Sequence, residues 1–206
     1  MKRRAFLKIV GGVAGSEMLG IRPTLVSEAE AAEAPVGVMP RRPLGRTGWQ
    51  VSVVGFSGLG LTHYDQARCT AEVRQAFEQG VNYFDVAPAY DKGMCETKLG
   101  FALRDLDRSR YFLACKTKKL ERDGARAELE HSLQQLQTDH FDVYQLHHLV
   151  KPADAQAALG PGGALEALMQ AKKEGKIRAI GFSAHTTKAA LAALRGAHEL
   201  IPFCPE

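Results

Sequence analysis

Four side chains that could hold or move a proton follow four successive apolar segments of the chain. They are Asp85, Lys116, His147 and Ser183, and each stands at or directly after the C-terminal end of its segment. Tyr90 follows Asp85 after five residues, across a loop that contains proline. A carboxylate, an ammonium, an imidazole and a phenol gathered in one place could transfer a proton to or from a substrate.

The apolar segments predict strands, and the segments between them predict helices. Runs of β-branched and aromatic residues favour strands, whereas apolar residues three or four positions apart favour helices with one buried face. Strands are expected at 51–56, 81–85, 111–115, 141–146 and 177–182. Helices are expected at 70–79, from 96 onward, around 129–136, at 163–174 and at 187–195. Because a parallel β/α barrel places its catalytic groups where strands end, the polar residues are expected to meet at one rim.

Alternation along the strand before Lys116 separates its two faces. Lys116 and Ala114 are expected on one face, and Cys115 on the other, toward the helices. An inward polar side chain is costly without a partner, so Lys116 is expected to pair with Asp85 on the neighbouring strand end. The helices are expected to bury apolar stripes against the sheet. In the last two helices these stripes contain Leu165, Leu168 and Met169, and then Leu191 and Leu194.

The spacing of Asp85, Ala87 and Tyr90, with Lys116 and His147 at the next two strand ends, resembles the aldo/keto reductase family. The similarity also extends to three further stretches, at 42–61, 96–100 and 174–183. The resemblance implies an α/β fold of the aldo/keto reductase type, a (β/α)₈ TIM barrel.

The resemblance also implies a reaction, the transfer of a hydride between NADPH and an aldehyde or ketone. Tyr90 would act as the general acid, although free tyrosine titrates only near pH 10. A nearby ammonium favours the phenolate, which is the role expected of Lys116, while Asp85 holds and neutralises that ammonium. His147 is expected to donate a hydrogen bond to the substrate oxygen. This chemistry needs no metal.

The same resemblance assigns Gly58, Leu59 and Ser183 to the binding of the cofactor. A glycine lets the backbone approach a ligand closely, although the glycines of this stretch could equally form a tight turn between a strand and a helix. Family members often carry asparagine after the serine, where it binds the nicotinamide carboxamide. Ala184 stands there in this chain, so part of that clamp is expected to be missing.

The number of β/α units sets the expected extent of the barrel. About five units are expected, whereas the complete barrel has eight and typically about 250 residues. In a chain of 206 residues the sequence therefore predicts an incomplete barrel, weak or no binding of NADPH, and open strand edges that favour self-association. Two alternatives stay open. One is an inactive fragment of such an enzyme, and the other is a cofactor-binding subunit without catalysis, similar to the ion-channel β subunits of this fold.

Composition supports one folded domain after the N-terminal segment. With 45% hydrophobic and 24% charged residues, the chain can bury one sizeable core. The formal charge of +4 is spread along the chain, so it does not predict binding to nucleic acid. The four cysteines lack metal-ligand spacing and are expected to be unpaired thiols. The expected partner is a small carbonyl compound.

Residues 1–34 are expected to be a twin-arginine signal peptide, and residues 35–206 the partial barrel domain. Arg3 and Arg4 precede an apolar segment of signal-peptide length that is too short to span a bilayer. The expected location is the periplasm, with no stable membrane anchor after cleavage. Glu17 lies inside the apolar segment and argues against a signal. The alternative is a cytoplasmic protein with a basic N-terminus.

Overall fold

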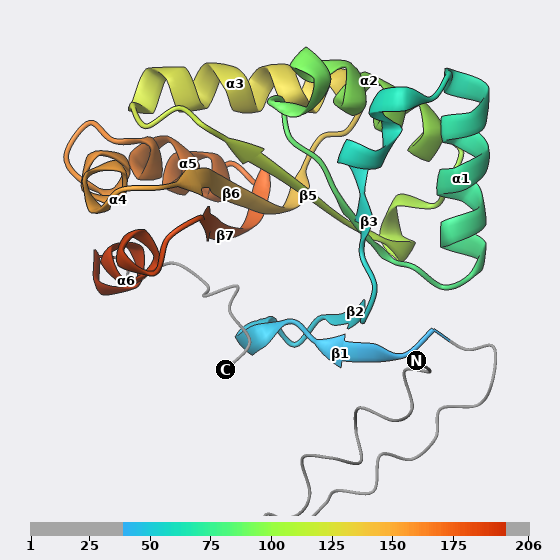
Figure 1. Cartoon of the computed structure of the whole chain (residues 1–206), viewed down its shortest axis with the longest axis horizontal. Coiled ribbons are helices and arrows are strands. Elements are labelled where there is room, and N and C mark those ends of the chain that lie inside the picture. Colours follow the sequence, from blue (N-terminus) through green and yellow to red (C-terminus); the bar gives the residue numbers. More distant parts are fainter. Residues whose placement is uncertain (1–38, 197–206) are drawn as a thin grey trace, which may run out of the picture. The chain divides into compact units, whose positions relative to one another are not determined.

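Five parallel strands form the main sheet, in the order in which they occur along the chain (Figure 1). The computed structural model describes residues 39–196. Each strand pairs in parallel with the next, so the segments between them cross back over the sheet. This α/β arrangement is that of a (β/α) barrel over five strands, as the sequence predicted. The strands are β3 (Phe56–Ser57), β4 (Tyr83–Asp85), β5 (Phe112–Thr117), β6 (Phe141–Leu149) and β7 (Ile177–Ala184).

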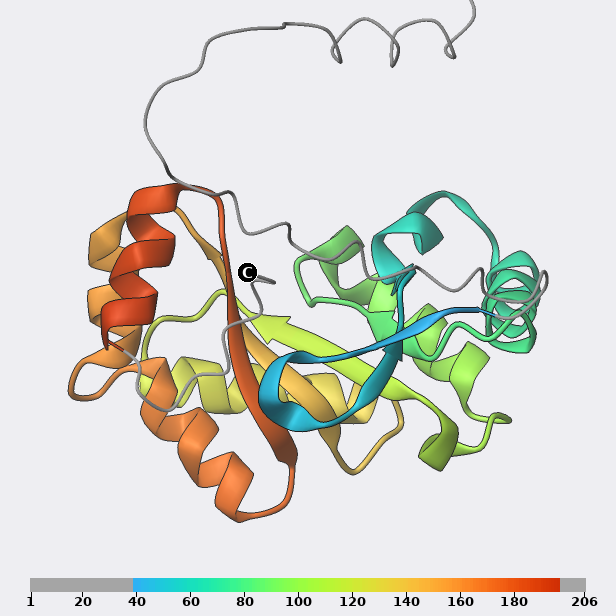
Figure 2. The ribbon, with the colours of Figure 1, turned by 90° about the horizontal axis from the view of Figure 1, so that it is seen from below.

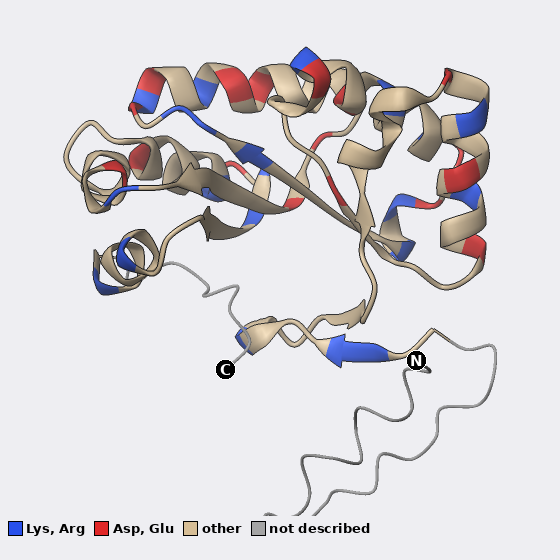
Figure 3. Cartoon of the chain, viewed as in Figure 1, with Lys and Arg blue, Asp and Glu red and all other residues tan. Residues whose placement is uncertain are grey.

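The helices follow the strands and cover one side of the sheet. The side chain of Asp65 accepts a hydrogen bond from Arg68 N at 2.8 Å, which caps the first turn of α1 and starts this helix four residues before the predicted position. Charged residues of both signs lie along α1 and α3 in Figure 3, as expected for helices with one face in water. The helices are α1 (Gln66–Glu78), α2 (Met94–Leu103), α3 (Arg122–Gln135), α4 (Pro152–Leu159), α5 (Ala164–Lys173) and α6 (Thr187–Gly196). Short 3₁₀ helices are η2 (Gly45–Thr47), η3 (Gly58–His63), η4 (Tyr90–Gly93) and η5 (Arg108–Arg110).

The two faces of the sheet carry different cores. The outer face packs large side chains such as Leu113 and Tyr144 against the helices, and both are at most 1% exposed. The inner face carries a layer of small residues, Ala114, Val143 and Ala179, which lie side by side in the register of β5, β6 and β7. The small side chains leave room on the inner face for other groups of the chain.

An antiparallel hairpin, β1 (Arg41–Pro43) and β2 (Gln50–Ser52), packs its connection against this inner layer. Trp49 stacks on Phe112 with ring centroids 5.3 Å apart, and the guanidinium of Arg178 lies 4.8 Å from the Trp49 ring. Both partners stand at the beginnings of their strands, so the hairpin covers the N-terminal end of the inner face. Figure 2 shows the hairpin crossing in front of the strands.

The prediction of one strand at 51–56 is wrong, because this segment is divided between the hairpin and the main sheet. Ser52 Oγ donates to Val54 O at 2.7 Å, where the chain bends. The Asn82 side chain accepts a hydrogen bond from Ser52 N at 2.7 Å and donates one to Gln50 O at 3.0 Å. These bonds attach β2 to the start of β4, and the sheet strand begins only at Phe56.

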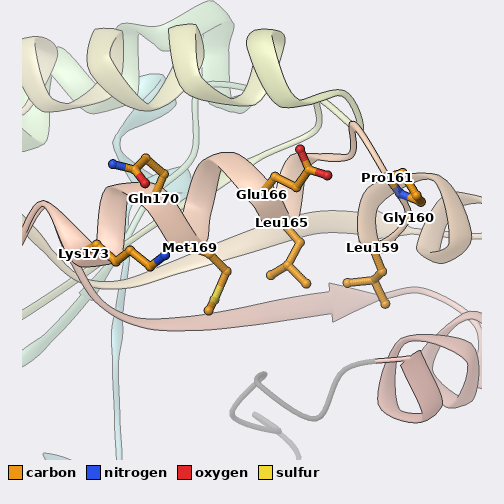
Figure 4. Close-up of a pocket in the computed structure, with 8 residues that line it drawn as sticks. All are labelled: Leu159, Gly160, Pro161, Leu165, Glu166, Met169, Gln170 and Lys173. Atoms are coloured by element: carbon orange, nitrogen blue, oxygen red, sulfur yellow. The ribbon is translucent and has the colours of Figure 1, made fainter.

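The predicted apolar stripes of the last two helices are only partly correct. Leu168 is fully buried, but Leu165 and Met169 are half-buried and line an open hollow beside α4 (Figure 4). Leu191 and Leu194 are exposed by 44% and 41%. In α5 and α6 alanines occupy buried positions instead, which lets both helices approach their neighbours closely. The short helix α4 was not predicted.

Several predictions fall outside the described residues. The signal peptide at 1–34, Cys204 and the last segment of the chain lie there. Within residues 39–196, no helix is long and apolar enough to cross a membrane. The other three cysteines are free thiols and are buried.

Candidate active site

Lys116 lies at the centre of the candidate active site, near the C-terminal end of β5. Its side chain is 7% exposed. The Lys116 ammonium donates hydrogen bonds to the Asp85 carboxylate, to Val86 O at 3.1 Å and to the Tyr90 hydroxyl at 3.2 Å. An ammonium has three N–H donors, so these acceptors satisfy all of them. The predicted pairing of Asp85 with Lys116 is therefore confirmed.

Asp85 ends β4 and holds this ammonium at the rim. Burial raises the pKa of Asp85, and the adjacent Lys116 opposes that rise. A carboxylate and an ammonium in contact cancel most of each other's field at a distance. The pair thus places a positive group beside Tyr90 without leaving a net charge buried.

Tyr90 begins η4, in the loop between β4 and α2. Its backbone N donates to Ala87 O at 2.9 Å, and its half-buried side chain reaches back to Lys116. After Tyr90 the backbone is left-handed at three residues, Asp91, Lys92 and Gly93, with φ of 49°, 53° and 89°. Left-handed backbone is unfavourable for residues other than glycine, so the turn depends on contacts that hold both of its ends.

His147 lies within β6, whereas the sequence predicted that the strand would end just before it. The register between β6 and β7 shifts between Leu146 and Leu149, and His148 in that interval has a φ of 64°. Such a bulge re-aims the side chains at the end of a strand. The ring of His147 packs edge to face on Tyr90, with centroids 5.8 Å apart.

The imidazole of His147 is held neutral. Burial lowers the pKa of His147 to about 4, and the nearby cations Lys116 and Lys118 act in the same direction. A neutral imidazole has one N–H to donate. Among residues 39–196, the buried Nδ1 of His147 has no hydrogen-bond partner.

This shift gives the folding of the protein a pH dependence. In the unfolded chain His147 takes up a proton near pH 6.5, whereas in the folded chain it does so only near pH 4. The unfolded state therefore binds more protons between these values, and stability should fall as the pH falls from 6.5 to 4. Urea unfolding of wild type and His147→Gln should diverge in this window and run parallel above it. The exposed His63→Gln is the control, and parallel curves down to pH 4 would contradict the assignment.

The structure places Ser183 apart from Gly58 and Leu59, the other two residues assigned to cofactor binding. Ser183, half-buried near the end of β7, accepts a hydrogen bond from His148 N at 3.0 Å and keeps its own O–H to donate. Gly58 packs on the end of β4, where a Cβ would lie 2.8 Å from Val86 Cγ2, so this close approach needs a glycine. The side chain of Leu59 is beside it and 51% exposed. Cofactor binding by these three residues stays a prediction.

Two polar groups near the site were not singled out from the sequence. Gln145 is 6% exposed and pairs in register with Lys116, so the alternation along β6 could have identified it. The exposed rings of His148 and His185 lie 4.1 Å apart between centroids. The contact between His148 and His185 depends on the bulge in β6, which no pattern in the sequence indicates.

Comparison with known proteins agrees with this geometry. The sequence model of the Aldo/keto reductase family matches residues 53–203, so the chain belongs to this family of oxidoreductases. L-galactose dehydrogenase of Arabidopsis thaliana is 34% identical over 154 residues, which are 69% of this chain and 47% of that protein.

Solved structures give the same result. An aldo-keto reductase from Bacillus halodurans in its holo form has a TM-score of 0.68 at 28% identity, over 78% of this chain and 55% of that one. An aldo-keto reductase from Klebsiella pneumoniae in complex with NADPH has a TM-score of 0.65 at 28% identity, over 77% and 54%. The chain thus spans about half the length of the relatives that it matches.

Proposed function

We propose that this chain carries the carbonyl-reducing groups of an NADPH-dependent aldo/keto reductase, with Tyr90 as the general acid. The observation behind the proposal is the Tyr90 hydroxyl at 3.2 Å from Lys116, an ammonium that also contacts the Asp85 carboxylate. The substrate would be a small aldehyde or ketone. The NADPH complex of the Klebsiella pneumoniae relative supports the choice of cofactor.

The polar groups at the rim fit the nicotinamide end of such a cofactor. Ser183 has an O–H to donate and Gln145 offers an amide on the inner face, while Gly58 and Leu59 stand after β3, at the other edge of the sheet. When bound, NADPH supplies the hydride that reduces the carbonyl carbon. Ala184, in place of asparagine, leaves Ser183 and Gln145 as the polar groups available for the carboxamide.

The residues of this chain handle the carbonyl oxygen. Tyr90 gives its phenolic proton to that oxygen as the C–O double bond is reduced, and the product leaves as an alcohol. Lys116, in contact with the phenol, stabilises the phenolate that remains until solvent returns a proton. Asp85 keeps Lys116 in place. The neutral His147 donates its N–H to the same oxygen, which orients the substrate and stabilises the developing negative charge.

The direct test measures oxidation of NADPH with simple aromatic aldehydes and ketones. We would assay the full chain and a chimera in which residues 39–196 continue into the C-terminal part of the Bacillus halodurans relative. The chimera should consume NADPH only when a carbonyl is present, and Lys116→Met should abolish that turnover. A chimera that binds NADPH but reduces no carbonyl would contradict the proposal and favour a cofactor-binding role without catalysis.

A further inference from the structure

Glu96 is a carboxylic acid with no exposed surface, located behind the candidate active site. It is the third residue of α2, and its Oε1 accepts a hydrogen bond from the thiol of Cys115 at 3.4 Å. Burial raises the pKa of Glu96, and the nearby Ser132 hydroxyl and Cys115 thiol oppose that rise. The mechanism above does not use this group. Burying a carboxylic acid is costly unless it is hydrogen-bonded, and the Cys115 thiol supplies such a bond.

The contact joins the two elements that carry Lys116 and Tyr90. Cys115 directly precedes Lys116 in β5, with its side chain on the opposite face of the sheet, as the sequence predicted. Glu96 lies in the first turn of α2, which follows η4 and therefore Tyr90. The hydrogen bond thus fastens the helix after Tyr90 to the strand that presents Lys116.

The turn between Tyr90 and α2 needs such a fixed point. Its residues Asp91 and Lys92 adopt the left-handed conformation, which is strained for residues other than glycine, and a turn of this kind persists only where its surroundings hold it. The first end is held by Tyr90, through Ala87 O and Lys116. The second end is Gly93, where a Cβ would lie 3.8 Å from Glu96 Oε2.

We propose that Glu96 is a positioning residue. Through Cys115 it fixes α2 on β5, and this holds the strained turn so that the Tyr90 hydroxyl stays in contact with Lys116. The consequence for catalysis rests on the proposed function, whereas the consequence for the turn does not. The two can therefore be tested separately.

The test compares Glu96→Gln with Glu96→Leu in the full chain, by hydrogen exchange followed by mass spectrometry. Glutamine keeps the size of the side chain and an acceptor for the Cys115 thiol, so exchange should match wild type. Leucine keeps the volume and removes the acceptor. Amides of residues 90–94 should then exchange about tenfold faster, the effect of losing one hydrogen bond of about 1.4 kcal/mol, while α5 stays protected.

A second variant tests the same contact from the strand. Cys115→Val removes the thiol donor and should accelerate exchange in the same segment, which keeps the test decisive if Glu96→Leu does not fold. Equal acceleration in 90–94 and in α5 would show a role in global stability only and would overturn the proposal. So would unchanged exchange in 90–94.

Turnover in the chimera separates this inference from the proposed function. Glu96→Leu should lower kcat about tenfold at unchanged KM, and Glu96→Gln should restore it. The chimera could show no turnover while Glu96→Leu still accelerates hydrogen exchange in residues 90–94. This result would contradict the reductase proposal and support the positioning role. Wild-type kcat in Glu96→Leu would overturn the positioning role.

Discussion

Tyr90→Phe is expected to lower kcat for carbonyl reduction by about 10²-fold or more, with the affinity for NADPH unchanged. The substitution deletes only the hydroxyl that contacts Lys116 and leaves the ring packed against His147. A proton donor contributes in the transition state and little to ground-state binding, so the loss should appear in kcat. Steady-state rates of NADPH oxidation, with the dissociation constant from a fluorescence titration, measure both quantities in the chimera.

Tyr64→Phe is the matched control for this substitution. Tyr64 is 38% exposed, stacks under Arg68 and lies outside the candidate site. Its hydroxyl can be removed without touching Lys116, so kcat should stay at the wild-type value. Turnover of Tyr90→Phe within a factor of about two of wild type would mean that another group protonates the substrate.

Asp142→Ala is expected to have the largest effect on stability, a loss of about 2 to 4 kcal/mol in the free energy of unfolding. Asp142, in β6, is fully buried, and its carboxylate joins three other elements. Oδ2 accepts from Arg108 at 2.8 Å and from Leu113 N at 2.9 Å, and Oδ1 accepts from Arg178 at 2.6 Å. Alanine would leave the Leu113 N–H without its acceptor and would remove the buried carboxylate that pairs with both guanidinium groups.

Urea denaturation followed by circular dichroism measures this loss. A domain typically has about 5 to 15 kcal/mol of stability in total, so the midpoint should shift clearly. The control is Asp139→Ala, because the Asp139 side chain is 91% exposed and pairs with His140, its neighbour in the sequence. A loss below about 1 kcal/mol in the free energy of unfolding of Asp142→Ala would contradict the prediction. It would show that the contacts of the carboxylate with the two arginines contribute little to stability.

Much of the sheet and of the rim could be predicted, because both follow from local patterns. Apolar runs that end in a polar residue predicted the four strands β4 to β7, and period-two alternation placed Lys116 and Cys115 on opposite faces. The cost of an unpaired inward charge predicted the contact of Lys116 with Asp85. Each of these inferences needs only residues near in sequence and the pairing of adjacent strands.

Features that depend on distant side chains could not be read in this way. The division of the predicted first strand depends on Asn82, which binds backbone atoms of Gln50 and Ser52 some thirty residues earlier. The burial of Asp142 depends on arginines 34 residues before it and 36 residues after it. The bulge at His148 reflects pairing with β7 rather than any pattern within β6.

The small residues of the inner face lie between the two ends of the strands. The N-terminal end carries the hairpin, and the C-terminal end carries the candidate active site. At one end Trp49 contacts Phe112 and Arg178, and at the other Lys116 contacts Tyr90. Ala114, Val143 and Ala179 form the buried layer between these two ends of the inner face. Selection for heat resistance can act on the hairpin end, while selection for new substrates acts on the rim. The changes in free energy of unfolding caused by mutations at the two ends should therefore be additive.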